Sequence, residues 1–114
     1  MSGIALLSDR YQYHLYTGHT DMRKQFDGLC GIVRNELGRE VTLGDVFIFV
    51  NKRGSHIKLL LKEADGMTML YRRLHKGRFR LPDLTENQIS IRMSATDLLS
   101  LLSGLHLHRW KKGA

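Results

Sequence analysis

The chain has 114 residues, of which 42% are hydrophobic and 25% charged, and its formal net charge is +7. These values are ordinary for one soluble globular domain and exclude a largely disordered chain. No apolar run approaches the roughly 20 residues that a membrane-spanning helix needs, and a single cysteine, Cys30, excludes an internal disulfide. The N-terminus has no charged-then-apolar leader, so we expect a cytoplasmic protein with one domain over 1–114, its core at about 10–105 and a frayed basic tail at 106–114.

The positive charge is concentrated in one segment. Between Lys52 and Arg80 there are nine lysines or arginines and two acidic residues, whereas the rest of the chain has nine of each sign. Such a segment is typical of proteins with a polyanionic partner, because neutralising phosphates releases condensed counterions. A merely solubilising surface is the alternative.

The first predicted elements are a strand and a helix. Residues 11–16 alternate in polarity, which indicates a short strand. Apolar residues then recur at spacings of three and four, which predicts a helix over about 20–37. Thr20 or Asp21 is the expected N-cap, and Gly38 is the expected end of the helix.

Two glycines within this helix, Gly28 and Gly31, lower its intrinsic stability, so we expect another element to approach closely there. Residues 46–50 are apolar on both faces, which is typical of a central strand. After a turn at 51–54, residues 57–62 alternate and predict a strand with one core face and one basic, wetter face.

The second half continues as a predicted meander. Asp65-Gly66 is a strong signal for a hairpin turn, followed by a strand at 67–74. A further turn at Lys76-Gly77 leads into 78–82, and residues 89–93 alternate as one more short strand.

A second helix is predicted over 94–104, where Ser94 and Asp97 resemble a capping box. Strands in the middle with helices at both ends indicate an α+β domain. The predicted architecture is a central antiparallel β-meander of four to five strands, with one helix at about 20–37 and a C-terminal helix at about 94–104.

The sequence shows no catalytic or metal-binding constellation. Of six histidines only His106 and His108 lie close together, and no ligand motif accompanies them. Cys30 lies on the apolar stripe of the first helix, where a buried filler is more common than a nucleophile. The acidic residues are scattered through turns and helix ends, so no two-metal site can be assembled from them. We therefore predict no enzymatic activity, no metal and no cofactor.

The basic segment favours nucleic acid because cations alternate with aromatic side chains. Five cations between Arg72 and Arg80 are interleaved with Tyr71 and Phe79. Guanidinium groups bind phosphates and aromatic rings stack on bases, so the combination is typical of nucleic-acid binding. The alternative is that Tyr71 and Phe79 fill the core, which we expect for at least one of them. The candidate nucleic-acid-binding residues are Lys52, Arg53, Lys58, Lys62, Arg72, Arg73, Lys76, Arg78 and Arg80.

Several ordered motifs also resemble a known family. They are Gly18-His19-Thr20-Asp21-Met22-Arg23-Lys24 with Phe26-Asp27-Gly28-Leu29, Phe47-Ile48-Phe49, Asn51-Lys52-Arg53-Gly54, Lys58-Leu59-Leu60, and Tyr71 to Pro82 with its Lys-Gly-Arg-Phe-Arg core. Over about 16–104 the chain resembles the TnpB accessory proteins of the IS-sixty-six group of bacterial insertion sequences, which are distinct from the RNA-guided nucleases that share the name TnpB. The resemblance implies a part in transposition beside a separate transposase, with no established enzymatic activity.

These inferences lead to two main hypotheses. In the first, the protein is a non-catalytic accessory factor that binds the DNA of transposon ends, or a transposase–DNA complex, through its basic hairpin region. In the second, it is an adaptor that docks on the transposase without touching DNA, using the first helix or the hairpin. An enzyme acting on nucleic acid is a weaker third hypothesis. Neither a membrane nor a small-molecule substrate is expected.

Overall fold

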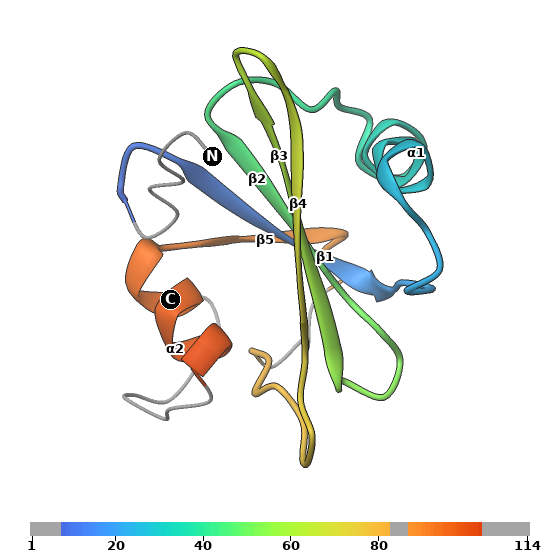
Figure 1. The fold of residues 1–114 in the computed structure, drawn as a ribbon, viewed down its shortest axis with the longest axis vertical. Helices are drawn as coiled ribbons and strands as arrows, with labels where there is room; N and C mark the ends of the chain where they lie inside the picture. The colour runs from blue at the N-terminus through green and yellow to red at the C-terminus, as the bar shows by residue number, and fades with distance from the viewer. Residues whose placement is uncertain (1–7, 83–86, 104–114) are drawn as a thin grey trace.

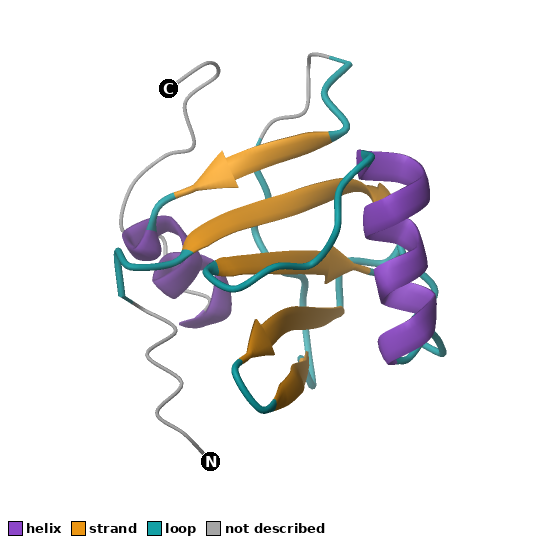
Figure 2. Ribbon diagram, turned by 90° about the horizontal axis from the view of Figure 1, so that it is seen from above, coloured by secondary structure: helices purple, strands orange, loops and turns teal. Residues whose placement is uncertain are grey.

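Five strands form one mixed sheet with a helix packed on each side (Figure 1, Figure 2). The structure is a computed structural model that describes residues 8–82 and 87–103. In chain order the elements are β1 (Gln12–His19), α1 (Phe26–Leu37), β2 (Asp45–Val50), β3 (His56–Glu63), β4 (Gly66–Arg73), β5 (Ser90–Met93) and α2 (Ala95–Ser103). The strands lie in the order β4-β3-β2-β1-β5. The predicted α+β class is confirmed.

The predicted meander is confirmed for three strands, since β2, β3 and β4 are joined by antiparallel pairings. β1, in contrast, runs parallel to β2, and β5 pairs antiparallel with the other edge of β1. A parallel pair requires a crossover connection, and α1 supplies it between β1 and β2. The sheet is therefore mixed, with β2 at its centre, buried along its whole length as its two-sided apolar sequence predicts.

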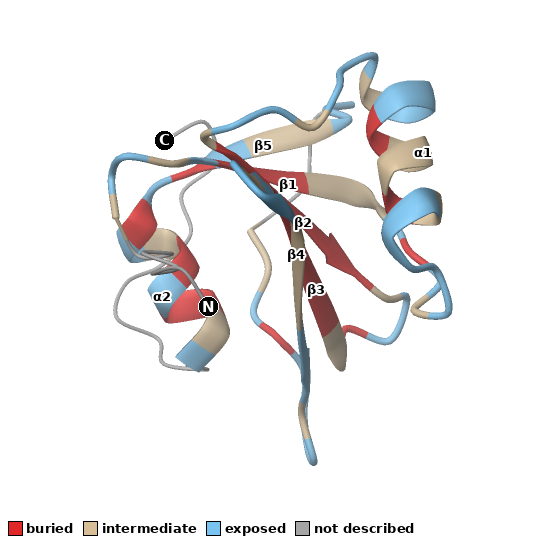
Figure 3. Cartoon of the chain, turned by 45° about the horizontal axis from the view of Figure 1, so that its top comes forward, coloured by how far each residue is buried: buried red, intermediate tan, exposed pale blue. Residues whose placement is uncertain are grey.

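The core is divided by the sheet into two clusters (Figure 3). The larger cluster lies on the α2 side, and its members include Ile48, Leu59 and Leu98. The smaller cluster lies under α1, where Leu29 and Val33 of the helix pack on apolar residues of β2 and β3. Both faces of β3 are therefore covered along most of its length, so the predicted wet, basic face of this strand is wrong.

The start of α1 differs from the prediction. The helix begins at Phe26, about five residues after the expected caps Thr20 and Asp21. Asp21 instead closes a local turn, in which its carboxylate accepts hydrogen bonds from the backbone and side chain of Arg23. The side chain of Lys58 donates hydrogen bonds to carbonyl groups of the segment before the helix. These bonds hold that segment out of helical geometry.

Two other predicted helix ends are confirmed. Gly38 terminates α1 with a left-handed φ of 64°, and its N–H donates to the carbonyl of Val33. At α2, Ser94 and Asp97 form the reciprocal capping box, with N–H to side-chain distances of 3.0 and 3.2 Å.

The glycines of α1 do not mark a close approach of another element, contrary to expectation. A Cβ added at Gly31 would meet nothing within 4 Å. At Gly28 the nearest atoms, 3.1 Å from such a Cβ, belong to the side chain of Lys24, just before the same helix. These glycines instead help to line an open hollow between α1 and the end of β1.

Candidate nucleic-acid interface

The interface is built from two basic turns that the backbone ties together. The turn Asn51–Gly54 connects β2 to β3, and the second turn follows β4. The N–H of Leu74 donates to the carbonyl of Ser55 at 2.9 Å, and the N–H of Phe79 donates to that of Gly54 at 2.8 Å. Segments about twenty or more residues apart in the sequence thus lie side by side at one end of the sheet. Residues 78–82, which follow the predicted turn at Lys76-Gly77, form no strand and lie against the first turn.

The first turn is held rigid by its own side chain and by a glycine. The Asn51 side-chain oxygen accepts hydrogen bonds from the N–H groups of Ser55 and His56, at 2.9 and 3.0 Å. Gly54 has a φ of 74°, a left-handed conformation that costs glycine little. A Cβ there would also lie 3.6 Å from the Arg78 side chain. The two turns are therefore fixed against each other at the glycine, and Lys52 and Arg53 extend from the exposed tip.

An irregularity in β1 opens a cleft beside these turns. The β1–β2 pairing is regular up to Leu15 and then shifts, so that His19 next pairs with Val50. Within the shifted stretch, Thr17 forms its hydrogen bonds on the edge of β1 that lies away from β2. Its N–H and its hydroxyl both donate to the carbonyl of Ile89, each at 3.0 Å. β1 therefore bulges away from the β2–β3 turn, leaving a cleft of about 170 Å³.

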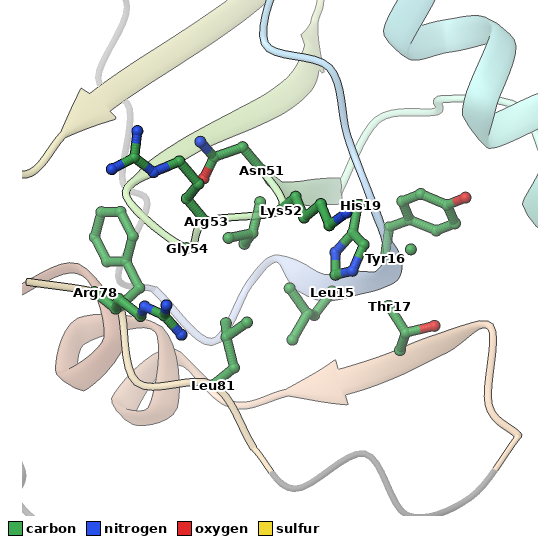
Figure 4. Close-up of a pocket in the computed structure, with 13 residues that line it drawn as sticks. Leu15, Tyr16, Thr17, His19, Asn51, Lys52, Arg53, Gly54, Arg78 and Leu81 are labelled. Atoms are coloured by element: carbon green, nitrogen blue, oxygen red, sulfur yellow. The ribbon is translucent and has the colours of Figure 1, made fainter.

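The cleft has an apolar interior and a basic rim (Figure 4). Leu15 and Leu81 lie at its middle, with the side chains of Lys52 and His19 on one flank and Arg78 on the other. None of the described residues that line it is acidic. Within the described part of the chain, neither Lys52, Arg53 nor Arg78 takes part in a salt bridge. The cleft therefore presents positive charge that none of the described acidic side chains neutralises.

Four further candidate cations lie at the same end of the sheet, and all four are exposed: Arg72, Arg73, Lys76 and Arg80. Arg73 is paired with His56 and Arg72 with Ile57, so the two arginines occupy opposite faces of β4, as predicted. Lys62 is also exposed but lies near the hairpin tip, six residues along β3 from His56, or about 20 Å away. The structure thus gathers seven of the nine candidates and separates Lys62 from them.

Lys58 is not part of the surface. Its side chain is 1% exposed, and its ammonium donates to the carbonyls of Met22 and Lys24 at 2.7 and 2.8 Å. Burial lowers the pKa of this ammonium, because removal from water disfavours the charged form. Lys58 therefore has a structural role. Its prediction as a nucleic-acid contact is wrong, because its ammonium is buried inside the protein.

The two aromatic residues of the basic segment have separate roles. Phe79 is 4% exposed and belongs to the core cluster on the α2 side. Tyr71 is 54% exposed on the outer strand. The expectation that at least one of them fills the core is confirmed for Phe79.

A buried polar cluster on the α1 side had no sequence signal. His14 Nε2 lies 2.9 Å from Asp45 Oδ1, and the Thr42 hydroxyl donates to the other carboxylate oxygen at 2.7 Å. Burial would raise the pKa of Asp45, but hydrogen bonds from His14 and Thr42 and the nearby charge of Arg39 outweigh it and hold this pKa below its ordinary value. These residues are far apart in sequence, so only the fold reveals the cluster. His19, which lines the basic cleft, lies in one of the family motifs but was not among the candidate contacts.

Other site types find little support among the described residues. They contain no group of three or more histidine, cysteine, aspartate or glutamate side chains that could hold a metal ion. Burial raises the pKa of Cys30, which disfavours its reactive thiolate. His106, His108 and the tail at 106–114 lie outside the described residues. No helix in the described part of the chain is long and apolar enough to cross a membrane.

Comparison with known proteins identifies the family. Residues 11–112 match the family model described as IS66 Orf2 like protein. The chain is 36% identical over 89 residues to the uncharacterized protein y4hO of Sinorhizobium fredii (strain NBRC 101917 / NGR234), covering 78% of this chain and 76% of that protein. It is 27% identical over 96 residues to the uncharacterized protein y4jC of the same strain, covering 84% and 80%. No solved structure matches. The chain belongs to the IS66 Orf2-like family, the accessory proteins of insertion elements that its motifs resemble.

Proposed function

We propose that this accessory protein binds the DNA of its insertion element through the basic end of its sheet, without catalysing a reaction. The observation that carries the proposal is the cleft between the two tied turns. Lys52, Arg53 and Arg78 surround it, and no described acidic residue lines it. Four exposed arginines and lysines of β4 and the following turn extend this surface. On such a surface, contacts with phosphates account for most of the affinity, and contacts with the bases account for little.

Salt dependence of binding to a short labelled duplex tests the proposal. If about six phosphates are contacted, affinity falls roughly 10³-fold between about 50 and 200 mM salt. The triple variant Lys52→Ala/Arg53→Ala/Arg78→Ala should reduce the slope of log affinity against log salt by about 3, because each lost contact releases about one counterion fewer. Fluorescence anisotropy at several salt concentrations measures both quantities.

A charge-matched control separates a local site from general attraction. Arg10, Lys62 and Arg92 are also exposed, but none of them lines the cleft. Their triple alanine variant removes the same charge and should leave most of the salt slope in place. Equal losses in both variants, or no duplex binding by the unaltered protein at low salt, would contradict the proposed site.

The outer strand favours a second function, docking on the transposase of the same element. In the described residues β4 pairs only with β3, so the backbone groups along its other edge are available over eight residues. An exposed edge of this kind can accept an extended segment of a partner. Co-purification of the transposase that survives nuclease treatment would support this function, and loss of the complex on nuclease treatment would favour DNA as the bridge.

A further inference from the structure

Tyr71 is an exposed aromatic residue whose ring is held in place from below. It lies on the outer strand β4 and is 54% exposed. The ammonium of Lys58 lies 4.8 Å from the ring centroid, on the side of the protein interior. The ring of His56 is also close, with a centroid separation of 5.9 Å. The buried cation thus occupies one face of the Tyr71 ring, while about half of the residue as a whole remains exposed.

The support beneath this ring is unusually fixed for a surface aromatic residue. Lys58 cannot move freely, because its ammonium is hydrogen-bonded to two backbone carbonyls before α1. A cation over an aromatic face also contributes attraction of its own, stronger where the cation is removed from water. Tyr71 therefore presents a flat apolar surface at little cost in conformational freedom.

Cations and a hollow lie beside the ring. A hollow of about 300 Å³ is lined by His56 together with Lys52 and Arg53 of the β2–β3 turn. Its acidic lining residue, Asp21, is already paired with Arg23 at 2.7 Å, which helps to lower the pKa of Asp21 to about 2. Arg73 follows Tyr71 by two residues on the same strand and therefore shares its face.

We propose that Tyr71 is a stacking platform for an unpaired base, so that this face of the protein binds single-stranded DNA. The inference rests on the proposed DNA-binding function and specifies its substrate class. A base stacks on the open face of Tyr71, and the phosphates on either side lie against Arg73 and the Lys52–Arg53 turn. Aromatic rings beside a positively charged groove are the common means of holding single strands, and paired bases within a duplex cannot offer the same face.

The test compares a single strand with a duplex of the same sequence at one salt concentration. Tyr71→Ala should weaken single-strand binding roughly 5- to 150-fold, the range that loss of one stacked base produces, and leave duplex binding nearly unchanged. Tyr71→Phe keeps the ring and should retain affinity. With the unaltered protein, a 2-aminopurine placed in the strand should lose fluorescence on binding as it stacks.

Phe26→Ala is the matched control, because Phe26 is also an exposed aromatic residue, at 38%, but begins α1, and among the described residues no cation lies over its ring. It should bind both DNA forms as the unaltered protein does. Duplex binding that persists with no effect of Tyr71→Ala and no change in 2-aminopurine fluorescence would overturn this inference alone. Absence of binding to either form would overturn the proposed function with it.

Discussion

The two sides of the sheet achieve stability by different means. On the α2 side the core is almost entirely apolar, with the Tyr13 hydroxyl and Ser100 as its polar exceptions, and the basic segment itself contributes Phe79 to it. On the α1 side the apolar cluster is smaller, and charged or polar groups are buried among it, notably Lys58 and the His14–Asp45 pair. Buried apolar area stabilises one side, whereas the other also depends on particular hydrogen bonds. Substitutions on the two sides should therefore change the free energy of unfolding by different amounts, and these changes should respond differently to pH.

The largest effect is expected on the α2 side. Leu59 on β3 is 2% exposed and belongs to the larger cluster. Leu59→Ala should lower the free energy of unfolding by about 2–5 kcal/mol, through lost burial and the cavity left behind. Urea denaturation followed by circular dichroism measures it. The exposed Leu43→Ala is the control, and a cost for Leu59→Ala as small as that of Leu43→Ala would show that this side is not the main source of stability.

A smaller loss is expected from the neighbouring residue that faces α1. Lys58→Met keeps the side-chain length but leaves the carbonyls of Met22 and Lys24 without their donor, which should cost about 1–3 kcal/mol. Lys62→Met, at an exposed position of the same strand, should change stability by less than about 0.5 kcal/mol. Lys58→Met should leave the affinity for duplex DNA unchanged. A large loss of affinity in a folded variant would show that Lys58 does contribute to DNA binding.

The buried carboxylate should make stability depend on pH. Because the pKa of Asp45 is lower in the folded protein than in the unfolded chain, its contribution is complete above about pH 4 and is lost as the pH falls through the folded value. Asp45→Asn should therefore cost about 1–2 kcal/mol near neutral pH, and the difference from the unaltered protein should shrink in acid.

Denaturation curves at neutral and acidic pH measure this difference directly. The exposed Asp9→Asn serves as the control for removing one carboxylate. A cost of Asp45→Asn that stays constant down to strongly acidic pH would mean that packing, and not the charge, holds this cluster together.

The sequence predicted those features that depend on local patterns. The two-sided apolar run of β2, the glycine end of α1 and the capping box of α2 were all found, because each is a property of a few neighbouring residues. The charge count likewise located the basic segment. Local rules did not show that β1 would pair with β2 in parallel, since this pairing depends on how α1 packs across the sheet.

The candidate site was predictable in part for the same reason. Alternation along β3 assigned Lys58 to a wet face, but β4, α1 and the segment before it cover that face and bury the side chain. The tie between Gly54 and Phe79 joins segments far apart in sequence, so the cleft between the turns could not be foreseen. His19 joins the cleft only through the shift in β1.

The smallest expected effect is a gain in stability, and it concerns the open hollow beside α1. Gly31 lies within α1, and a Cβ there would meet nothing within 4 Å. Gly31→Ala should therefore stabilise the protein by about 0.5–1 kcal/mol, because alanine is the better helix former and the unfolded chain has less freedom to lose. Thermal denaturation should show Tm rising by about 2–5 °C.

Gly28→Ala is the matched comparison and should gain less, because the Lys24 side chain lies 3.1 Å from the new methyl group. Destabilisation by Gly31→Ala would mean that the space beside Gly31 is not open and that α1 is closely packed at this position.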